Sequence, residues 1–165
     1  MEKTIVLAGG CFWGTEALVK RIPGVLNTTT GYSNSVIQNP TYEMVCKNMT
    51  GAAEAVQISY NPDILSLDKL LAIYFESIDP TSFEKQGGDV GNQYRTGIYY
   101  THSEDLPIIQ KVFEEVAERY REPLQVELAP LTNFYPAEEY HQDYLDKNPT
   151  GYCHVNLGLL KKFGL

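Results

Sequence analysis

Cys11 is the side chain with the greatest chemical potential in this sequence, and it lies in the segment Gly10-Cys11-Phe12-Trp13-Gly14. A cysteine at the start of a helix is favoured as a nucleophilic thiolate, because the helix N-terminus carries partial positive charge and free N–H groups. An arbitrary buried cysteine more often serves only as a small hydrophobic residue. The chain's only tryptophan lies close to Cys11, and a rigid aromatic ring at a glycine-flanked turn is typical of a pocket wall. We therefore predict a reactive cysteine beside an aromatic pocket.

Two carboxyl groups and two tyrosines in polar loops are the next candidates, namely Glu54, Asp89, Tyr42 and Tyr94. Glu54 stands among three alanines, and a partly buried carboxyl group keeps its proton to higher pH, so it could act as an acid. The alternative for Glu54 is an edge-strand side chain that points to solvent. Asp89, in a Gly-Gly-Asp turn, is most often a residue that hydrogen-bonds its own backbone. Position in the sequence alone therefore favours a structural role for both Glu54 and Asp89.

The three histidines, His102, His141 and His154, are not spaced as metal ligands, and the adjacent Cys153 and His154 do not form a zinc motif. We therefore expect neither a structural nor a catalytic metal. His141 could act as a base for Cys11 in a cysteine hydrolase or acyltransferase, or it could be a surface residue of a helix. A further possibility, of another class, is a non-catalytic module that binds peptides in an aromatic pocket.

Hydrophobic periodicity and turn residues predict the elements that would position these side chains. Short strands are expected at 3–8, 25–32, 55–60, 94–100 and 125–128. Helices are expected at about 13–21, 67–78, 104–120 and 137–145. Loops are expected at 33–42 and 86–93. This mixed order predicts a two-layer α+β domain, with helices against a largely antiparallel sheet, and it places Cys11 between a strand and a helix.

The composition is that of an ordinary globular domain, with 43% hydrophobic and 21% charged residues. The length of 165 residues predicts a single domain over residues 1–165. A formal net charge of −8 argues against binding to nucleic acid or to a membrane surface, and no apolar stretch reaches the ~18 residues of a spanning helix. Three widely spaced cysteines do not resemble a secreted disulfide framework, so we expect a cytoplasmic protein in which any disulfide is transient.

Several motifs, in a fixed order along the chain, carry a resemblance to a known family. They are Gly10-Cys11-Phe12-Trp13-Gly14 with Glu16, Asn39-Pro40-Thr41-Tyr42 with Val45-Cys46, Gly51-Ala52-Ala53-Glu54, Gly87-Gly88-Asp89 with Gly91, Gln93, Tyr94 and Arg95, and Glu139, His141, Gln142 and Tyr144 with Gly151-Tyr152-Cys153. Together they resemble the A-type peptide methionine sulfoxide reductases over nearly the whole chain. The sequence departs from the family's usual pattern at Ala52 and Ile78, where histidine is common, and at Asn34-Ser35, which replace a Gly-Gly pair.

The resemblance implies reduction of methionine-S-sulfoxide, free or in proteins, without a metal or organic cofactor. It implies the family's fold, a two-layer α/β roll of the ferredoxin-like kind. The residue roles that it carries over are a nucleophile at Cys11, a methyl pocket at Phe12 and Trp13, a proton donor at Glu54, donors to the sulfoxide oxygen at Tyr42 and Tyr94, and a supporting carboxylate at Asp89.

The tail at about 148–165 carries the candidate resolving cysteine. Cys153 matches a cysteine with which many family members convert the sulfenic acid on the nucleophile into a disulfide, and Cys46 is the alternative partner. The resemblance implies thioredoxin as the usual reductant of that disulfide. We expect the protein to be a monomer.

Overall fold

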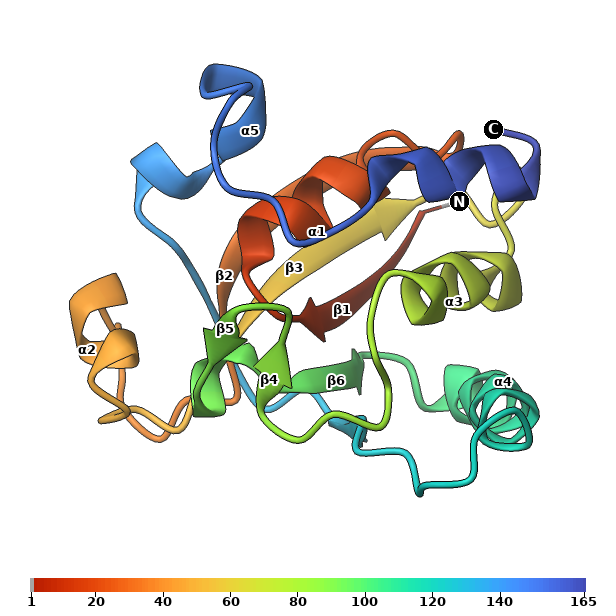
Figure 1. Cartoon of the computed structure of the whole chain (residues 1–165), viewed down its shortest axis with the longest axis horizontal. Coiled ribbons are helices and arrows are strands. Elements are labelled where there is room, and N and C mark those ends of the chain that lie inside the picture. The colour runs from red at the N-terminus through yellow and green to blue at the C-terminus, as the bar shows by residue number, and fades with distance from the viewer. Residues whose placement is uncertain (1) are drawn as a thin grey trace.

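The computed structural model describes residues 2–165, and its centre is the β-sheet shown in Figure 1. Within these residues six strands pair in the spatial order β7-β6-β1-β3-β2-β8. They are β1 (Lys3–Gly9), β2 (Val25–Ser33), β3 (Ala53–Tyr60), β6 (Thr96–Tyr100), β7 (Glu127–Pro130) and β8 (Phe134–Pro136). Neighbouring strands are antiparallel except for β6 and β7, which are parallel. A separate ribbon consists of β4 (Lys85–Gln86) and β5 (Asp89–Val90).

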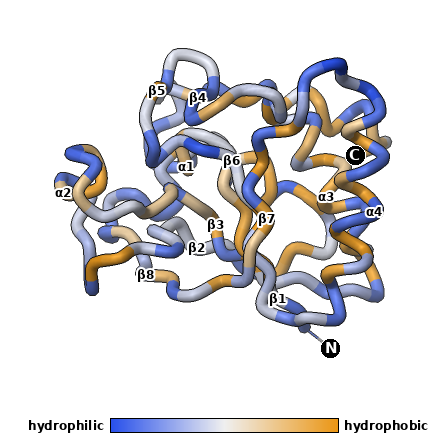
Figure 2. Tube along the Cα trace, turned by 90° about the horizontal axis from the view of Figure 1, so that it is seen from below, coloured by the Kyte–Doolittle hydropathy of each residue, from blue (hydrophilic) through white to orange (hydrophobic). Residues whose placement is uncertain are grey.

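The helices are α1 (Phe12–Val19), α2 (Tyr42–Cys46), α3 (Leu67–Glu76), α4 (Leu106–Ala117) and α5 (Tyr144–Lys147). Helix α3 begins where the Ser66 hydroxyl accepts the backbone N–H of Lys69 at 3.4 Å, which satisfies one free donor of the first turn. Figure 2 shows hydrophobic and hydrophilic residues interspersed along α4, which packs against α3. None of the helices described within residues 2–165 has both the length and the hydropathy that crossing a bilayer requires.

The sheet separates two hydrophobic clusters, because successive residues of a strand face opposite sides. In β1, Ile5 and Leu7 belong to the larger cluster, which also contains the buried residues of α1, α3 and α4. Val6 and Ala8 face the other side, where Phe134 is among the residues packed against them. Helices α1, α3 and α4 therefore cover one face of the sheet. The prediction of an α+β fold with a largely antiparallel sheet is confirmed.

The helix predicted over 137–145 is the largest error in the predicted elements. The segment instead contains a 3₁₀ turn at Glu139–His141 and the short helix α5. Between them, the Gln142 side chain accepts the N–H of Thr30 and donates to its carbonyl oxygen, both at 2.9 Å. Asp143 then adopts a positive φ of 54°. These bonds to β2 replace the local bonds of a continuous helix, so the segment is broken at this point.

The tail, in which the sequence predicts no clear period, ends in a 3₁₀ helix at Leu157–Phe163. This helix lies against α3: Leu160 is buried in the larger cluster, and Lys162 Nζ lies 2.9 Å from Glu76 Oε1. Before it, residues 151–156 contain neither helix nor strand, and in Figure 1 this blue segment passes beside α1. The tail thus brings Cys153 to the same side of the sheet as Cys11.

Candidate active site

Cys11 lies at the turn between β1 and α1, as predicted. Gly10 adopts a φ of +85°, which glycine tolerates, and Cys11 is the N-cap residue of α1. The side chain is only 6% exposed. Burial raises the pKa of its thiol, and nearby Glu54 raises it further when its carboxyl group is ionised, whereas the backbone N–H of Trp13 acts in the opposite direction. The helix start therefore does not suffice to make Cys11 a thiolate, because burial outweighs it.

Glu54 projects from β3, a strand that lies between β1 and β2, and it is fully buried. The interpretation as a solvent-facing edge residue is therefore wrong. Its Oε1 accepts the backbone N–H of Phe12 at 3.3 Å, and its Oε2 accepts Nε2–H of Gln93 at 3.2 Å. Burial raises the pKa of Glu54 to about 8, although both hydrogen bonds act to lower it. At neutral pH this carboxyl group therefore holds a proton immediately beside the Cys11 turn.

Tyr42, Tyr94 and Asp89 gather around Glu54 from three different segments. Tyr42 begins α2, Tyr94 ends the 3₁₀ turn Asn92–Tyr94, and Asp89 lies in β5. Burial raises the pKa of both tyrosines, and Glu54 raises it further when ionised, so both hydroxyls keep their protons and can donate hydrogen bonds. The charge of Asp89 also acts on Cys11 and on Glu54, and Oδ2 of Asp89 is buried without a hydrogen-bond partner within residues 2–165. The structure thus brings together all of the predicted polar residues.

Phe12 and Trp13 form an aromatic wall next to Cys11. Phe12 is buried, and its ring stacks near that of Tyr42 with the centroids 6.3 Å apart. Trp13 is half-buried, and its ring stacks on Tyr144 at 3.7 Å with an angle of 8° between the planes. Trp13 Nε1–H also donates to Nδ1 of His141 at 2.9 Å. The indole is therefore held in one orientation by a stacked ring and a hydrogen bond, and it keeps part of its surface free.

His141 is completely buried, so its interpretation as a surface residue is wrong. Because Nδ1 accepts the hydrogen bond from Trp13, the ring proton is on Nε2. Burial lowers the pKa of His141, which keeps the ring neutral at pH 7. The nitrogen that could act as a base is thus already used to hold Trp13. This arrangement speaks against a hydrolase in which His141 activates Cys11.

Glu138 contributes to the site although it is not among the residues that the sequence motifs select. Its carboxylate accepts the hydroxyl of Tyr32 at 2.7 Å and the backbone N–H of Tyr42 at 3.0 Å. Burial alone would raise the pKa of Glu138, but these hydrogen bonds outweigh it, and the pKa is lowered. A stably ionised Glu138 therefore ties the start of α2 to β2. The only local signal was its position two residues after Pro136 in a polar segment.

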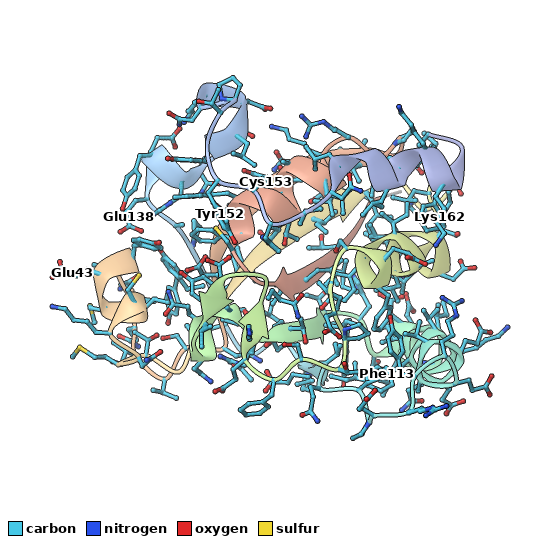
Figure 3. The ribbon with its side chains drawn as sticks, viewed as in Figure 1. Glu43, Phe113, Glu138, Tyr152, Cys153 and Lys162 are labelled. Carbon is cyan, nitrogen blue, oxygen red and sulfur yellow. The ribbon has the colours of Figure 1, made fainter. Side chains whose placement is uncertain are left out.

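The other two cysteines come to the site from different segments, the tail and α2. Cys153 is half-buried, its thiol donates to the carbonyl oxygen of Val155 at 3.3 Å, and Figure 3 shows it beside α1. A Cβ atom added to Gly14 would lie 3.3 Å from Cys153 Sγ, so this thiol faces the first turn of the helix that Cys11 caps. Cys46 ends α2, and its sulfur accepts Nε2–H of Gln93 at 3.4 Å. Cys46 therefore lies nearer the site than its polar surroundings in the sequence suggest.

Comparison with known proteins places this arrangement in one family. The family model described as peptide methionine sulfoxide reductase matches residues 3–163. A peptide methionine sulfoxide reductase MsrA from Lachnoclostridium phytofermentans is 58% identical over 155 residues, which are 94% of this chain and 93% of the relative.

Two solved structures of Mxr1 from Saccharomyces cerevisiae resemble the fold. The reduced form is 38% identical with a TM-score of 0.89, and the match covers 94% of this chain and 91% of that one. The form in complex with Trx2 is 28% identical with a TM-score of 0.62, and the match covers 87% and 84% of the two chains.

Proposed function

The chain belongs to the peptide methionine sulfoxide reductase family, and on that premise we propose how its own residues carry out the thiol-dependent reduction of methionine sulfoxide. The observation that carries the proposal is the protonated, fully buried Glu54 beside the Cys11 turn. A sulfoxide sulfur accepts a thiol nucleophile only if its oxygen is neutralised as it gains charge. The site must therefore combine a nucleophile, a proton donor and hydrogen-bond donors.

In the first step, the Cys11 sulfur attacks the sulfoxide sulfur while Glu54 gives its proton to the oxygen. Tyr42 and Tyr94 donate hydrogen bonds to the same oxygen as its negative charge grows. The oxygen ends on Cys11 as a sulfenic acid, and methionine is released. The Cys11 sulfur loses two electrons and the methionine sulfur gains them. The thiol proton of Cys11 replaces the proton that Glu54 gives up, so the step consumes no proton.

The buried thiol of Cys11 fits this order of events. Its raised pKa keeps it protonated and unreactive until a sulfoxide occupies the pocket. At neutral pH Glu54 is protonated, so it does not oppose ionisation of the thiol through its charge. Because the thiol supplies both electrons, we propose that the reaction uses neither a metal nor an organic cofactor.

The choice between the two sulfoxide epimers follows from two walls of the pocket. We propose that the substrate methyl lodges against Trp13, backed by Phe12, while the oxygen faces Glu54. In the mirror-image sulfoxide, one of these two groups would be placed wrongly. His141 and Tyr144 serve as positioning residues, because they hold the indole of Trp13. This arrangement selects methionine-S-sulfoxide, free or within a protein.

The tail returns Cys11 from the sulfenic acid to the reduced thiol. We propose that the Cys153 thiol attacks the sulfenic sulfur of Cys11, so that a disulfide forms and water leaves. Thioredoxin is the proposed reductant of this disulfide. In support, the related Mxr1 has been solved in complex with Trx2.

We propose further that residues 1–165 act as one catalytic domain and as a monomer in the cytoplasm, where thiols stay reduced. The fold is proposed to be the ferredoxin-like, two-layer α/β roll. The support for it is the order β1-α1-β2-β3-α3-β6, once the short elements α2, β4 and β5 are left out, together with the spatial order β6-β1-β3-β2 of antiparallel strands.

The test is incubation with racemic methionine sulfoxide and dithiothreitol, followed by chiral separation of the remaining substrate. We expect methionine to appear as the S epimer disappears and the R epimer to persist. A parallel reaction without dithiothreitol should stop after the enzyme's own thiols are consumed. Equal loss of both epimers would refute the proposed pocket. Binding without any change in substrate mass would support the peptide-binding module instead.

A further inference from the structure

The imidazole of His154, which the proposed reaction does not use, is fixed at the turn that carries Cys11. His154 Nε2 lies 2.7 Å from the carbonyl oxygen of Gly9, the last residue of β1. A carbonyl oxygen can only accept, so Nε2 carries the proton and donates it. The same oxygen accepts the hydroxyl of Thr15 at 3.3 Å, which ties it to α1 as well. The ring is therefore bonded to the backbone on which the nucleophile stands.

Two of the glycines around Cys11 leave the space that this ring occupies. A Cβ atom on Gly10 would lie 2.8 Å from His154 Nε2, and one on Gly14 would lie 3.2 Å from His154 Nδ1. Real Cβ atoms do not come within 2.8 Å of another side chain, so a larger residue at position 10 would displace the ring. Gly10 and Gly14 lie on either side of Cys11, and the ring contacts both. The glycine-flanked motif thus serves the docking of His154 as well as the turn itself.

The other ring nitrogen shows that His154 acts as a neutral donor. Nδ1 is buried and has no hydrogen-bond partner among the described residues, so nothing there would stabilise a second proton. Burial lowers the pKa of His154, and this effect outweighs the Gly9 carbonyl and the charge of Asp89, which act to raise it. The hydrogen bond to Gly9 is therefore made by the uncharged ring at neutral pH.

The hydrogen bond from His154 to Gly9 lies next to the Cys153 thiol in the chain and in space. Cys153 precedes His154, and Sγ of Cys153 and Nδ1 of His154 both lie within 3.3 Å of the Cβ position of Gly14. Val155, on the other side, lies 3.1 Å from the same position and is buried. Residues 151–156 contain neither helix nor strand, so the ladder bonds of regular structure do not hold this part of the tail. The bond from His154 to Gly9 is a direct link between the tail and the Cys11 turn.

We propose that His154 is a positioning residue for disulfide formation: its hydrogen bond to the Gly9 carbonyl holds Cys153 against the first turn of α1, within reach of Cys11. The inference rests on the proposed function, in which Cys153 resolves the sulfenic acid. In that step the Cys153 sulfur bonds to the Cys11 sulfur, the S–O bond breaks, and the thiol proton leaves with the hydroxide as water. His154 changes neither the electrons nor the protons of this step. It raises the fraction of molecules in which the two sulfurs can meet.

Three substitutions of His154 distinguish the effect of its hydrogen bond to Gly9 from the effect of having any side chain at this position. In His154→Gln the amide nitrogen is as many bonds from Cα as Nε2 is, so it can still donate to Gly9. In His154→Asn the amide is one bond shorter and cannot reach, and His154→Ala removes the side chain. The matched control is His102→Gln, the same change at an exposed histidine. His102 follows the end of β6, whereas the Cys11 turn lies at the start of that strand, where Gly9 pairs with Thr96. Thermal unfolding of each variant verifies that it is folded.

The experiment mixes reduced enzyme with one equivalent of methionine-S-sulfoxide and quenches with an alkylating reagent over time. Mass spectrometry then gives the methionine formed, the sulfenic acid on the Cys11 peptide, and the Cys11–Cys153 disulfide. We expect His154→Ala and His154→Asn to form the disulfide about tenfold more slowly, as loss of one hydrogen bond predicts. The sulfenic acid should accumulate in these two variants. His154→Gln should recover most of the rate, and His102→Gln should equal the parent protein.

The outcomes keep this inference separate from the proposed function. If the parent protein forms methionine but no disulfide between Cys11 and Cys153, the proposed role of Cys153 is wrong. If the parent forms that disulfide and His154→Ala forms it equally fast, the positioning role of His154 is wrong. A His154→Gln variant as slow as His154→Ala would also overturn it, because the donor to Gly9 would then be irrelevant.

Discussion

Glu54 and Cys153 are both proposed to act on the chemistry at Cys11, yet the protein holds these two residues in different ways. Glu54 lies on a strand with partners on both sides, is fully buried, and accepts two hydrogen bonds. Cys153 lies in a segment with neither helix nor strand and is half-buried, and its thiol donates to the nearby carbonyl oxygen of Val155. One group is fixed by the core of the fold, and the other is held on its surface.

The difference matches what the two half-reactions need. Proton donation to the sulfoxide requires a carboxyl group whose pKa is set by burial and whose position does not change. Disulfide exchange with a protein reductant requires a sulfur that a large molecule can reach, so the second thiol has to be near the surface. Substitutions in the pocket should therefore affect the first reduction, whereas substitutions in the tail should affect only later turnovers.

Cys11→Ser gives the largest expected effect, because both half-reactions use this sulfur. We expect no methionine at all from a folded variant, since a serine hydroxyl cannot take up the oxygen by losing two electrons. The measurement is methionine formed per enzyme in a single turnover, with circular dichroism to verify the fold. Methionine formed at the parent rate would show that another residue is the nucleophile. The proposed division of roles between the pocket and the tail would then be wrong.

Glu54→Gln should slow the first reduction by roughly 10²–10⁴, the usual loss on removing a general acid. The parent rate should fall as pH rises through about 8, because Glu54 loses its proton there, and the variant should lack this decline. Stopped-flow measurement of the first methionine between pH 6 and 9 tests both statements. A variant as fast as the parent would show that another group protonates the oxygen.

The same variant tests the raised pKa of Glu54 through the pH dependence of the free energy of unfolding. The folded-state pKa of about 8 lies above the ordinary value of 4.5, so burial of this carboxyl group costs no stability below pH 4.5 and an increasing amount as pH rises towards 8. Glu54→Gln should therefore be more stable than the parent at pH 8, and this gain should vanish near pH 4. Denaturant unfolding at the two pH values provides the comparison, and a gain that does not change with pH would contradict a raised pKa.

Cys153→Ser should leave the first reduction unchanged and stop the reaction after it. With thioredoxin as reductant, we expect one methionine per enzyme and a sulfenic acid trapped on the Cys11 peptide. A small dithiol should restore part of the turnover, because it can enter the pocket itself. Sustained turnover with thioredoxin would mean that the tail thiol is not the resolving one.

Cys46→Ser should have the smallest effect. Its sulfur accepts a hydrogen bond from Gln93, and a serine oxygen at the same place can accept it too. We therefore expect both the first methionine and the thioredoxin-dependent turnover to stay close to the parent values. Loss of turnover here, with Cys153→Ser active, would exchange the roles of the two thiols.

The sequence predicted those parts of the molecule that local pattern determines. The continuous apolar run Ile5-Val6-Leu7 predicts β1, and the apolar stripe of α3 predicts that helix. The turn at Gly9 and Gly10 places Cys11 correctly. The helix expected at 137–145 failed because Gln142 bonds to β2, which lies over 100 residues away in the sequence. Long-range bonds of this kind leave no periodic signal.

For the site, residue types and motifs were enough to select the chemistry, but not to predict its electrostatics. The thiol of Cys11 was expected to ionise readily at a helix start, and burial reverses that expectation. Glu54 could not be assigned as buried from its alanine neighbours alone, because burial depends on how β3 is placed in the sheet. Glu138 went unnoticed because its partners, Tyr32 and the N–H of Tyr42, come from distant segments.

Trp13 has a further consequence, because it is the only indole in the chain. The ring stacks on Tyr144 at 3.7 Å and donates to His141, so its excited state is sensitive to the closeness of two neighbouring rings. All of the protein's tryptophan fluorescence therefore arises from one wall of the proposed substrate pocket. A methyl group that lodges there alters the solvent around the indole and thus its emission, so the molecule contains its own optical probe of pocket occupancy.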